Sequence, residues 1–189
     1  MGQPQLKEVY YTYEDYVSWE AEERYELIDG VPYLMAAPSI MHQIISMNLS
    51  LAVGSYLKGK QCQALTGPID VRLNHDKGDD TVVQPDLVVV CDKEKIGKNT
   101  IKGAPDIVME IISPSSVQRD RLIKFNRYQQ AGVREYWILS PGETSAEVYV
   151  LVEGIYQTHG VYTRSDIATS VVLEELKIPL TDIFEADED

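Results

Sequence analysis

The chain contains 189 residues, a length that suits a single domain with a full hydrophobic core. Its 44% hydrophobic and 25% charged residues are typical of a globular protein, and no apolar run approaches the ~20 residues needed to span a bilayer. The formal net charge of −13 argues against a protein that coats nucleic acid without specificity.

The first elements expected along the chain are a helix and a hairpin. Apolar residues at helical spacing follow Thr12, a residue suited to cap a helix, and predict a helix over 13–23. Asp29-Gly30 is a turn dipeptide between two apolar runs, so residues 25–35 should form a β-hairpin.

A long helix and a group of strands should follow the hairpin. Ser39 is placed to begin the helix, which should end near Leu57. Runs of apolar and β-branched residues then predict strands at 62–66, 69–73 and 84–91, with a polar loop at 74–80.

The C-terminal half predicts further strands around one more helix. Residues 93–103 are rich in Lys and Gly and predict an exposed loop. A strand should end near Ile112, and Ser113-Pro114 then signals a helix that runs to about Ala131. The remaining strands are expected at 133–139, 146–152, 155–162 and 170–173.

Residues 1–189 therefore predict one domain, frayed at about 1–10 and 185–189. The chain does not begin with an apolar signal segment, so we expect a cytoplasmic protein. Cys62 and Cys91 have no metal-ligand spacing, and we expect two reduced thiols in or near the core.

Two apolar runs near the middle of the chain each contain an acid where a core residue would be expected. Asp86 lies in the run at 84–90 and Glu110 in the run at 105–112. Such runs predict strands buried on both faces, where an uncompensated carboxylate costs on the order of several kcal/mol. If the two strands are neighbours, the carboxylates converge, and a shared divalent metal such as Mg²⁺ or Mn²⁺ would explain both acids.

Lys124 lies on the helix that follows and can bring a positive charge to the same place. Asp120, Lys124 and Tyr128 are spaced four residues apart, so they share one helix face. The alternatives are structural: Asp86 caps a strand or pairs with an arginine, and Lys124 pairs with Asp120 at the surface, a contact worth ~0.3–0.5 kcal/mol. The presence of both acids favours the metal site.

The residues around these acids resemble the PD-(D/E)XK nuclease pattern, with Asp86 in Gln-Pro-Asp-Leu-Val-Val-Val and Glu110 in Pro-Asp-Ile-Val-Met-Glu-Ile-Ile. The chain from about Tyr13 to Phe184 also resembles the Uma-two family of restriction endonucleases. The matching stretches are 24–30, 38–42, 85–88, 105–115 and 132–138. The resemblance implies an α/β, restriction-endonuclease-like fold with a central mixed β-sheet flanked by helices.

The same resemblance implies a metal-dependent endonuclease that hydrolyses phosphodiester bonds of DNA. It gives catalytic and metal-binding roles to Asp86, Glu110 and Glu26, with Mg²⁺ or Mn²⁺ as the cofactor. It places the catalytic lysine at Lys124, because position 112 is Ile where the general motif has its lysine. The resemblance makes His42 a candidate for substrate contact. Arg121 and Arg127, basic residues near Lys124, are the other expected substrate-binding residues.

DNA is thus the expected partner, with RNA as the alternative substrate, and no association with a membrane is expected. A homodimer is expected because cleavage of both strands needs two sites. Residues 93–135 carry nine Lys or Arg and five Asp or Glu, so this segment is the basic part of an acidic chain. The acidic remainder favours the rival function, a module that keeps the nuclease fold and binds nucleic acid or protein without cutting.

Overall fold

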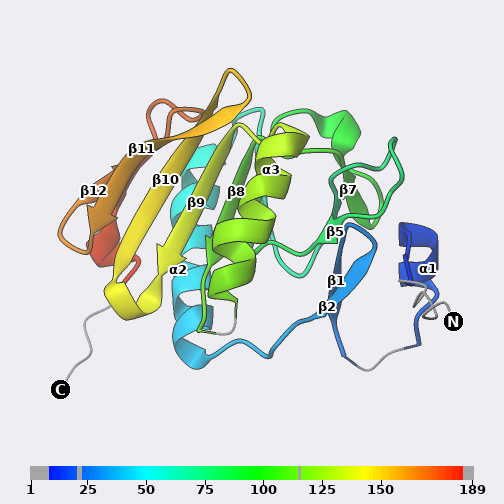
Figure 1. Ribbon diagram of the computed structural model, residues 1–189. Helices are drawn as coiled ribbons and strands as arrows, with labels where there is room; N and C mark the ends of the chain where they lie inside the picture. The colour runs from blue at the N-terminus through cyan, green and yellow to red at the C-terminus, as the bar shows by residue number, and fades with distance from the viewer. Residues whose placement is uncertain (1–8, 21–22, 115, 185–189) are drawn as a thin grey trace, which may run out of the picture.

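Two larger β-sheets and one small sheet organise this computed structural model, which describes residues 9–20, 23–114 and 116–184 (Figure 1). The six-stranded sheet has the order β11 (Ile155–Thr163), β10 (Ser145–Val152), β9 (Glu135–Ser140), β8 (Ile107–Ile111), β6 (Leu87–Val90) and β3 (Gln63–Thr66). The five-stranded sheet has the order β2 (Val31–Leu34), β1 (Tyr25–Ile28), β5 (Val82–Val83), β4 (Asp70–Arg72) and β7 (Thr100–Lys102). The third sheet pairs β12 (Ile167–Thr169) with β13 (Lys177–Pro179).

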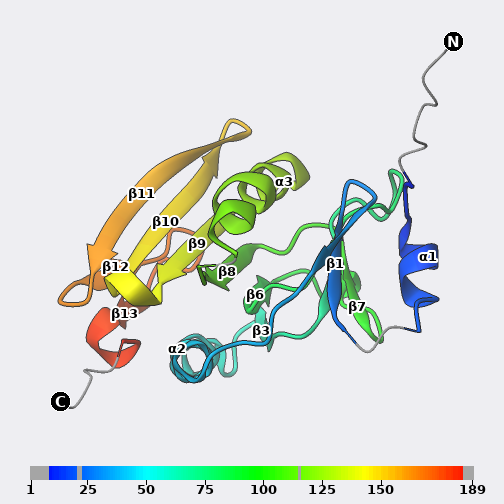
Figure 2. The ribbon, with the colours of Figure 1, turned by 60° about the horizontal axis from the view of Figure 1, so that its bottom comes forward.

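Helices cover both faces of the six-stranded sheet (Figures 1 and 2). One face carries α2 (Ile40–Leu57), and the other carries η2 (Arg119–Lys124) followed by α3 (Phe125–Ala131). The short α1 (Tyr13–Val17) lies beside the five-stranded sheet. Three further short turns of 3-10 helix are η1 (Lys93–Lys95), η3 (Pro141–Glu143) and η4 (Leu180–Asp182). Among the described helices, none has the length and apolar character that a membrane crossing requires.

Side-chain alternation along β6 and β8 divides the hydrophobic core into two parts. Leu87 and Met109 pack with the buried residues of α2. Val88 and Val108 belong to the opposite part of the core, where they pack with Tyr128 of α3 and with the five-stranded sheet. These strands are therefore buried on both faces, as their continuous apolar runs predict.

The predicted fold class is confirmed. In the six-stranded sheet β8 and β9 are parallel, whereas the other neighbouring strands are antiparallel, so the sheet is mixed. The predicted hairpin consists of β1 and β2. The long helix begins after Ser39, whose Oγ accepts a hydrogen bond from the N–H of His42 at 3.2 Å, and it ends at Leu57 as predicted.

Two predictions in the first part of the chain are wrong in extent. The predicted helix over 13–23 ends at Val17, where Ser18 turns its hydroxyl back to the carbonyl oxygen of Asp15 at 2.6 Å. The predicted loop at 93–103 contains β7, which pairs with β4 in parallel. Long-range pairing gives this polar segment an extended conformation that its composition does not predict.

The strand predicted at 170–173 is also absent among the described elements. The N–H groups of Val171 and Val172 both donate to Glu135 Oε2, at 2.7 and 2.9 Å, so this segment wraps around a buried carboxylate. The strands of this region are instead β12 and β13 on either side. Residues 1–8 and 185–189, in the ends predicted to fray, lie outside the described residues.

The prediction of two reduced thiols is wrong, because Cys62 and Cys91 form a disulfide bond. β3 and β6 are antiparallel with Gln63 opposite Val90, so the next residues outward are the two cysteines. Their separation of 29 residues along the chain conceals this contact until the strand pairing is known.

Candidate active site

The two predicted acids lie opposite each other on neighbouring strands. β6 and β8 are antiparallel with Leu87 opposite Met109, which places Asp86 opposite Glu110 one step further along. Asp86 Oδ2 also accepts a hydrogen bond from the N–H of Ile111 at 2.7 Å. The prediction that these strands are neighbours is confirmed, and their register places the two acids at the same end of the pair.

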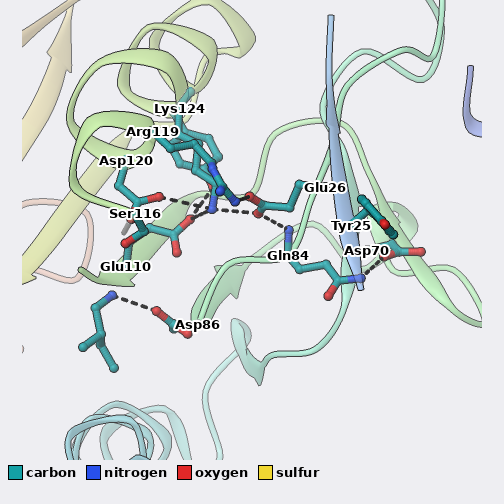
Figure 3. Close-up of polar contacts among 12 residues, drawn as sticks. Tyr25, Glu26, Asp70, Gln84, Asp86, Glu110, Ser116, Arg119, Asp120 and Lys124 are labelled. Atoms are coloured by element: carbon teal, nitrogen blue, oxygen red, sulfur yellow. Dashed lines mark hydrogen bonds and ion pairs between the residues drawn. The ribbon is translucent and has the colours of Figure 1, made fainter. Parts of the chain in front are cut away.

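Lys124 forms the centre of the site (Figure 3). Its Nζ lies 2.7 Å from Glu26 Oε1, 2.8 Å from Glu110 Oε1 and 3.5 Å from Asp120 Oδ1. The side chain is only 4% exposed, and the three carboxylates come from β1, β8 and η2. A single buried ammonium group thus connects the two larger sheets and the helical segment.

The backbone that carries Lys124 forms a π-helical turn, η2, directly before α3. Such wide turns are rare, and they occur frequently at functional sites. The hydroxyl of Tyr136 donates to the carbonyl oxygen of Asp120 at 3.1 Å, which ties the turn to β9. The continuation into α3 brings Tyr128 to the same face as Asp120 and Lys124, as their spacing predicts.

Glu110 is buried and hydrogen-bonded at one carboxylate oxygen. Its Oε1 accepts from Lys124 Nζ at 2.8 Å and from the hydroxyl of Tyr128 at 2.7 Å. Burial raises the pKa of Glu110 to about 8, although the charge of Lys124 acts to lower it. The protonation state of this carboxyl group therefore changes close to neutral pH.

Lys124 remains protonated at neutral pH. Burial acts to lower the pKa of its ammonium group, but the charges of Glu110, Glu26 and Asp120 outweigh burial and raise the pKa well above its ordinary value. The group can therefore stabilise negative charge, whereas it cannot serve as a base at neutral pH.

Glu26 connects the site to the five-stranded sheet. Its Oε1 accepts from the N–H of Gln84 at 2.8 Å, and its Oε2 lies 3.4 Å from Nη1 of Arg119. The side-chain amide of Gln84 then donates to Asp70 Oδ1 at 2.9 Å and to the hydroxyl oxygen of Tyr16 at 3.0 Å. Figure 3 shows this chain of contacts running from Lys124 through Glu26 and Gln84 to Asp70. These partners hold Glu26 in position.

His42 approaches the site from α2. Its Nε2 lies 2.8 Å from Asp86 Oδ1, so the imidazole and the N–H of Ile111 together occupy both oxygens of that carboxylate. Of the three predicted substrate contacts, His42 is the one that lies beside a predicted catalytic acid.

The structure does not bring Arg121 and Arg127 into this cluster. Arg121 forms an ion pair with Glu147 on β10 and donates to Ser140 Oγ at 3.3 Å. Arg127 forms an ion pair with Asp29 in the turn between β1 and β2. A substrate-binding role for either arginine stays a prediction.

Of the three predicted metal ligands, Asp86 and Glu110 suit a hard cation such as Mg²⁺. Among the described residues, no group of three or more His, Cys, Asp or Glu side chains is placed to hold a metal ion together. Mg²⁺ needs only one or two protein carboxylates, because water and substrate phosphate complete its coordination. Asp86, just before β6, and Glu110, on the neighbouring strand β8, supply two such carboxylates, whereas Glu26 is directed at Lys124 and Arg119.

Sequence reasoning did not identify Gln84 or Arg119 as parts of the site. Gln84 belongs to the apolar run at 84–90 that contains Asp86, so a polar residue two positions before a predicted catalytic acid was the available signal. Arg119 carries no such signal, because its partner Glu26 is 93 residues away in the chain.

Comparisons with known proteins agree with this geometry. The Uma2 family model, described as "Putative restriction endonuclease", matches residues 13–181. An uncharacterised protein of Synechocystis sp. is 27% identical over 139 residues, which cover 72% of each chain. The crystal structure of a "putative nuclease belonging to DUF820" from Anabaena variabilis has a TM-score of 0.74 at 20% identity, over 92% of this chain and 97% of that one. The fold is restriction-endonuclease-like, and the chain belongs to the Uma2 family.

Proposed function

We propose that this protein is a metal-dependent endonuclease that hydrolyses phosphodiester bonds of DNA. The observation that carries the proposal is the buried Lys124, held between Glu26 and Glu110 beside the strand that bears Asp86. A buried group of charges adds little net stability, and strongly shifted pKa values concentrate at functional sites. Membership of a family described as restriction endonucleases supports the nuclease reaction.

Asp86 and Glu110 would hold Mg²⁺ or Mn²⁺ through their carboxylate oxygens. When bound, such a cation lowers the pKa of a coordinated water and neutralises charge on the scissile phosphate. His42 orients the carboxylate of Asp86 through the 2.8 Å contact between Nε2 and Oδ1. Glu26 has a supporting role in this proposal, because it holds the ammonium group of Lys124 at 2.7 Å.

Lys124 supplies a fixed positive charge for the transition state of phosphodiester cleavage. Its raised pKa keeps that charge present at neutral pH, and its partners position it before substrate binds. Preorganised charge of this kind typically contributes about 100- to 1,000-fold to the rate. Tyr128 donates to the same oxygen of Glu110 as Lys124 does and so fixes the orientation of that carboxylate.

DNA is proposed as the substrate because restriction endonucleases, the activity in the family description, cut DNA. Positive charge near the site would come from the basic segment 93–135, in a chain that otherwise repels phosphate. RNA is the alternative substrate, and the rival function is a binding module that does not cut.

A cleavage assay on supercoiled plasmid, single-stranded DNA and RNA tests the proposal, with Mg²⁺, Mn²⁺ or EDTA present. The wild-type protein should cut DNA with either metal and should not cut in EDTA. Asp86→Asn should reduce cutting by about 100-fold or more, which is the size expected for loss of a preorganised catalytic group.

Asp106→Asn is the matched control, because it makes the same change just before β8, at the opposite end of that strand from the site. The carboxylate of Asp106 accepts from the N–H of Cys91 at 2.8 Å and pairs with Arg134 at 3.1 Å. Cutting that persists in EDTA, or in Asp86→Asn, would contradict the metal proposal. If the protein cut RNA alone, RNA would take the place of DNA as the proposed substrate. If it bound nucleic acid regardless of metal and cut none of the substrates, the binding module would be favoured.

A further inference from the structure

Arg119 places a second positive charge beside Lys124, on the more exposed side of the candidate site (Figure 3). Its guanidinium group is directed at the carboxylate that also holds Lys124, with Nη1 3.4 Å from Glu26 Oε2. The Arg119 side chain is 19% exposed, whereas the side chains of Lys124 and Glu26 are 4% and 1% exposed. Of these three groups, Arg119 is the one that a molecule arriving from solvent can contact without rearrangement.

The ammonium group of Lys124 has its hydrogen-bonding capacity taken up by the protein. It carries three N–H donors, and carboxylate oxygens of Glu26, Glu110 and Asp120 lie 2.7, 2.8 and 3.5 Å from its nitrogen. Its charge can act on a nearby phosphate through space, but a direct hydrogen bond to that phosphate would require a carboxylate to give way. Direct contact with the substrate is therefore expected to come from another cation.

The guanidinium group of Arg119, by contrast, has unused donors. A guanidinium group carries five N–H donors in a planar fork, and this fork suits two oxygens of one phosphate group. Arg119 directs one donor at Glu26 Oε2 and one at the carbonyl oxygen of Leu34, which is 3.1 Å away. The other three donors have no hydrogen-bond partner among the residues that the structure describes. A partly exposed cation at the site is thus able to bind an anion.

Contacts on several sides hold this guanidinium group in place before substrate binds. Besides Glu26 and Leu34, the ring of Tyr33 on β2 faces it, with 5.4 Å between the guanidinium carbon and the ring centroid. A cation within about 6 Å of an aromatic ring centroid is attracted to that ring. Arg119 also begins η2, the turn that carries Lys124, so the backbone fixes the two charges relative to each other. A group that is ordered in advance loses less entropy on binding.

The contact between Arg119 and Glu26 is long enough to yield to a phosphate. At 3.4 Å it exceeds the ordinary N–H···O distance of about 2.7–3.2 Å, and Glu26 is paired more closely with Lys124, at 2.7 Å. Arg121 and Arg127 form ion pairs of their own outside this cluster. Arg119 is therefore the arginine of this helical segment that is placed to meet a phosphate at the site.

We propose that Arg119 binds a backbone phosphate of the substrate at the entrance of the active site, through the donors that the protein leaves unused. The proposal rests on the proposed nuclease function and divides the work between two cations: Arg119 holds the substrate, whereas Lys124 stabilises charge in the transition state. Because every nucleotide carries the same phosphate, this contact should strengthen binding to DNA of any sequence.

DNA binding by variants at position 119 tests the proposal. Fluorescence anisotropy of a labelled DNA duplex in Mg²⁺ measures affinity, and each variant is built on Asp86→Asn so that the duplex stays intact. Arg119→Gln should weaken binding about tenfold or more, and it should reduce the slope of log affinity against log salt by about one, as expected for the loss of one phosphate contact. Arg119→Lys should restore only part of the affinity, because lysine lacks the planar fork.

Arg164→Gln, on the same Asp86→Asn background, is the matched control. Arg164 is also partly buried and donates to a backbone carbonyl, that of Phe184 at 2.8 Å, but it lies between β11 and β12. The control removes the same charge, so it should bind DNA with the affinity and the salt slope of its parent. Circular dichroism establishes that the variants are folded. Equal losses of affinity in Arg119→Gln and Arg164→Gln would overturn the proposal.

Cleavage kinetics separate substrate binding from the positioning of Glu26. In the otherwise wild-type protein, Arg119→Gln should raise KM for DNA with little change in kcat. A lower kcat with unchanged KM, DNA affinity and salt slope would overturn the proposal and make Arg119 a positioning residue for Glu26. If the wild type binds DNA without cutting it, the nuclease function fails, whereas weaker binding by Arg119→Gln would still support the phosphate contact. A wild-type protein that neither binds nor cuts DNA would overturn both.

Discussion

Two clusters of ion pairs arise from the same helical turn, η2, and they differ in their surroundings. Lys124 is 4% exposed and lies within 3 Å of carboxylate oxygens of Glu26 and Glu110. Arg121, three residues earlier, is 31% exposed and pairs with Glu147 at 2.5 Å. Both clusters join a basic side chain of η2 to carboxylates, but one is buried among three acids and the other is a single pair near the surface.

The pKa values of the two carboxyl groups are shifted in opposite directions, although burial acts to raise both. For Glu110, burial dominates and raises the pKa to about 8 despite the nearby ammonium group. For Glu147, burial also acts to raise the pKa, but hydrogen bonds from Arg121 and Tyr149 outweigh it and the pKa is lowered. The contact between Arg121 and Glu147 is therefore a hydrogen-bonded ion pair near the surface. In the buried cluster around Lys124, protons and cations compete for the carboxylate of Glu110.

The largest stability difference should follow removal of the two cations. Lys124→Met leaves three buried carboxylates without their partner and should lower the free energy of unfolding by about 3–5 kcal/mol. Arg121→Met removes a partly exposed pair and should cost less than about 1 kcal/mol. Urea unfolding of both variants at pH 7 measures the difference. Equal losses would show that burial does not separate the two clusters.

Opposite pH dependences should distinguish the two carboxylates next. Because the pKa of Glu110 is raised from 4.5 to about 8 in the folded protein, its contribution to stability is fully present below pH 4.5 and is lost as pH rises toward 8. The pKa of Glu147 is lowered, so its contribution is present above pH 4.5 and is lost as pH falls further.

Thermal unfolding between pH 3 and 9, with EDTA present, tests both statements. Glu110→Gln should flatten the curve between pH 4.5 and 8, and Glu147→Gln should flatten its acid limb. A Glu110→Gln curve parallel to that of the wild type across the upper range would be inconsistent with the raised pKa.

The smallest expected difference concerns two tyrosine hydroxyls. Tyr128→Phe removes the donor to Glu110 Oε1 and should cost about 1–2 kcal/mol, since the lost hydrogen bond is buried. Tyr149→Phe removes the corresponding donor to Glu147 Oε2 and should cost less than about 1 kcal/mol, because water can replace it. Denaturant unfolding of the pair provides the test, and a larger loss for Tyr149→Phe would reverse the comparison.

Local patterns predict much of this fold and part of the site. Turn dipeptides, a helix cap and apolar runs locate the hairpin, α2 and the strands that bear Asp86 and Glu110. Helix spacing also places Asp120, Lys124 and Tyr128 on one face. These features depend on residues within a few positions of each other, which is why the sequence alone suffices.

Contacts between segments that are far apart in the sequence cannot be predicted from such local patterns. The disulfide between Cys62 and Cys91 follows from strand pairing, and the contact of Arg119 with Glu26 needs both larger sheets in place. Arg121 lies on the same helical turn as Lys124, and only the position of β10 shows that it faces Glu147 instead of the buried acids.

Cleavage of supercoiled plasmid in Mg²⁺ by folded Lys124→Met and Arg121→Met, measured side by side, tests the central claim most directly. If the buried lysine is catalytic, Lys124→Met should lose about 100-fold or more of the wild-type rate at saturating substrate, and Arg121→Met, whose predicted role is substrate binding, should lose far less. Cleavage by Lys124→Met at the rate of Arg121→Met would contradict the account and leave the buried cluster with a structural role alone.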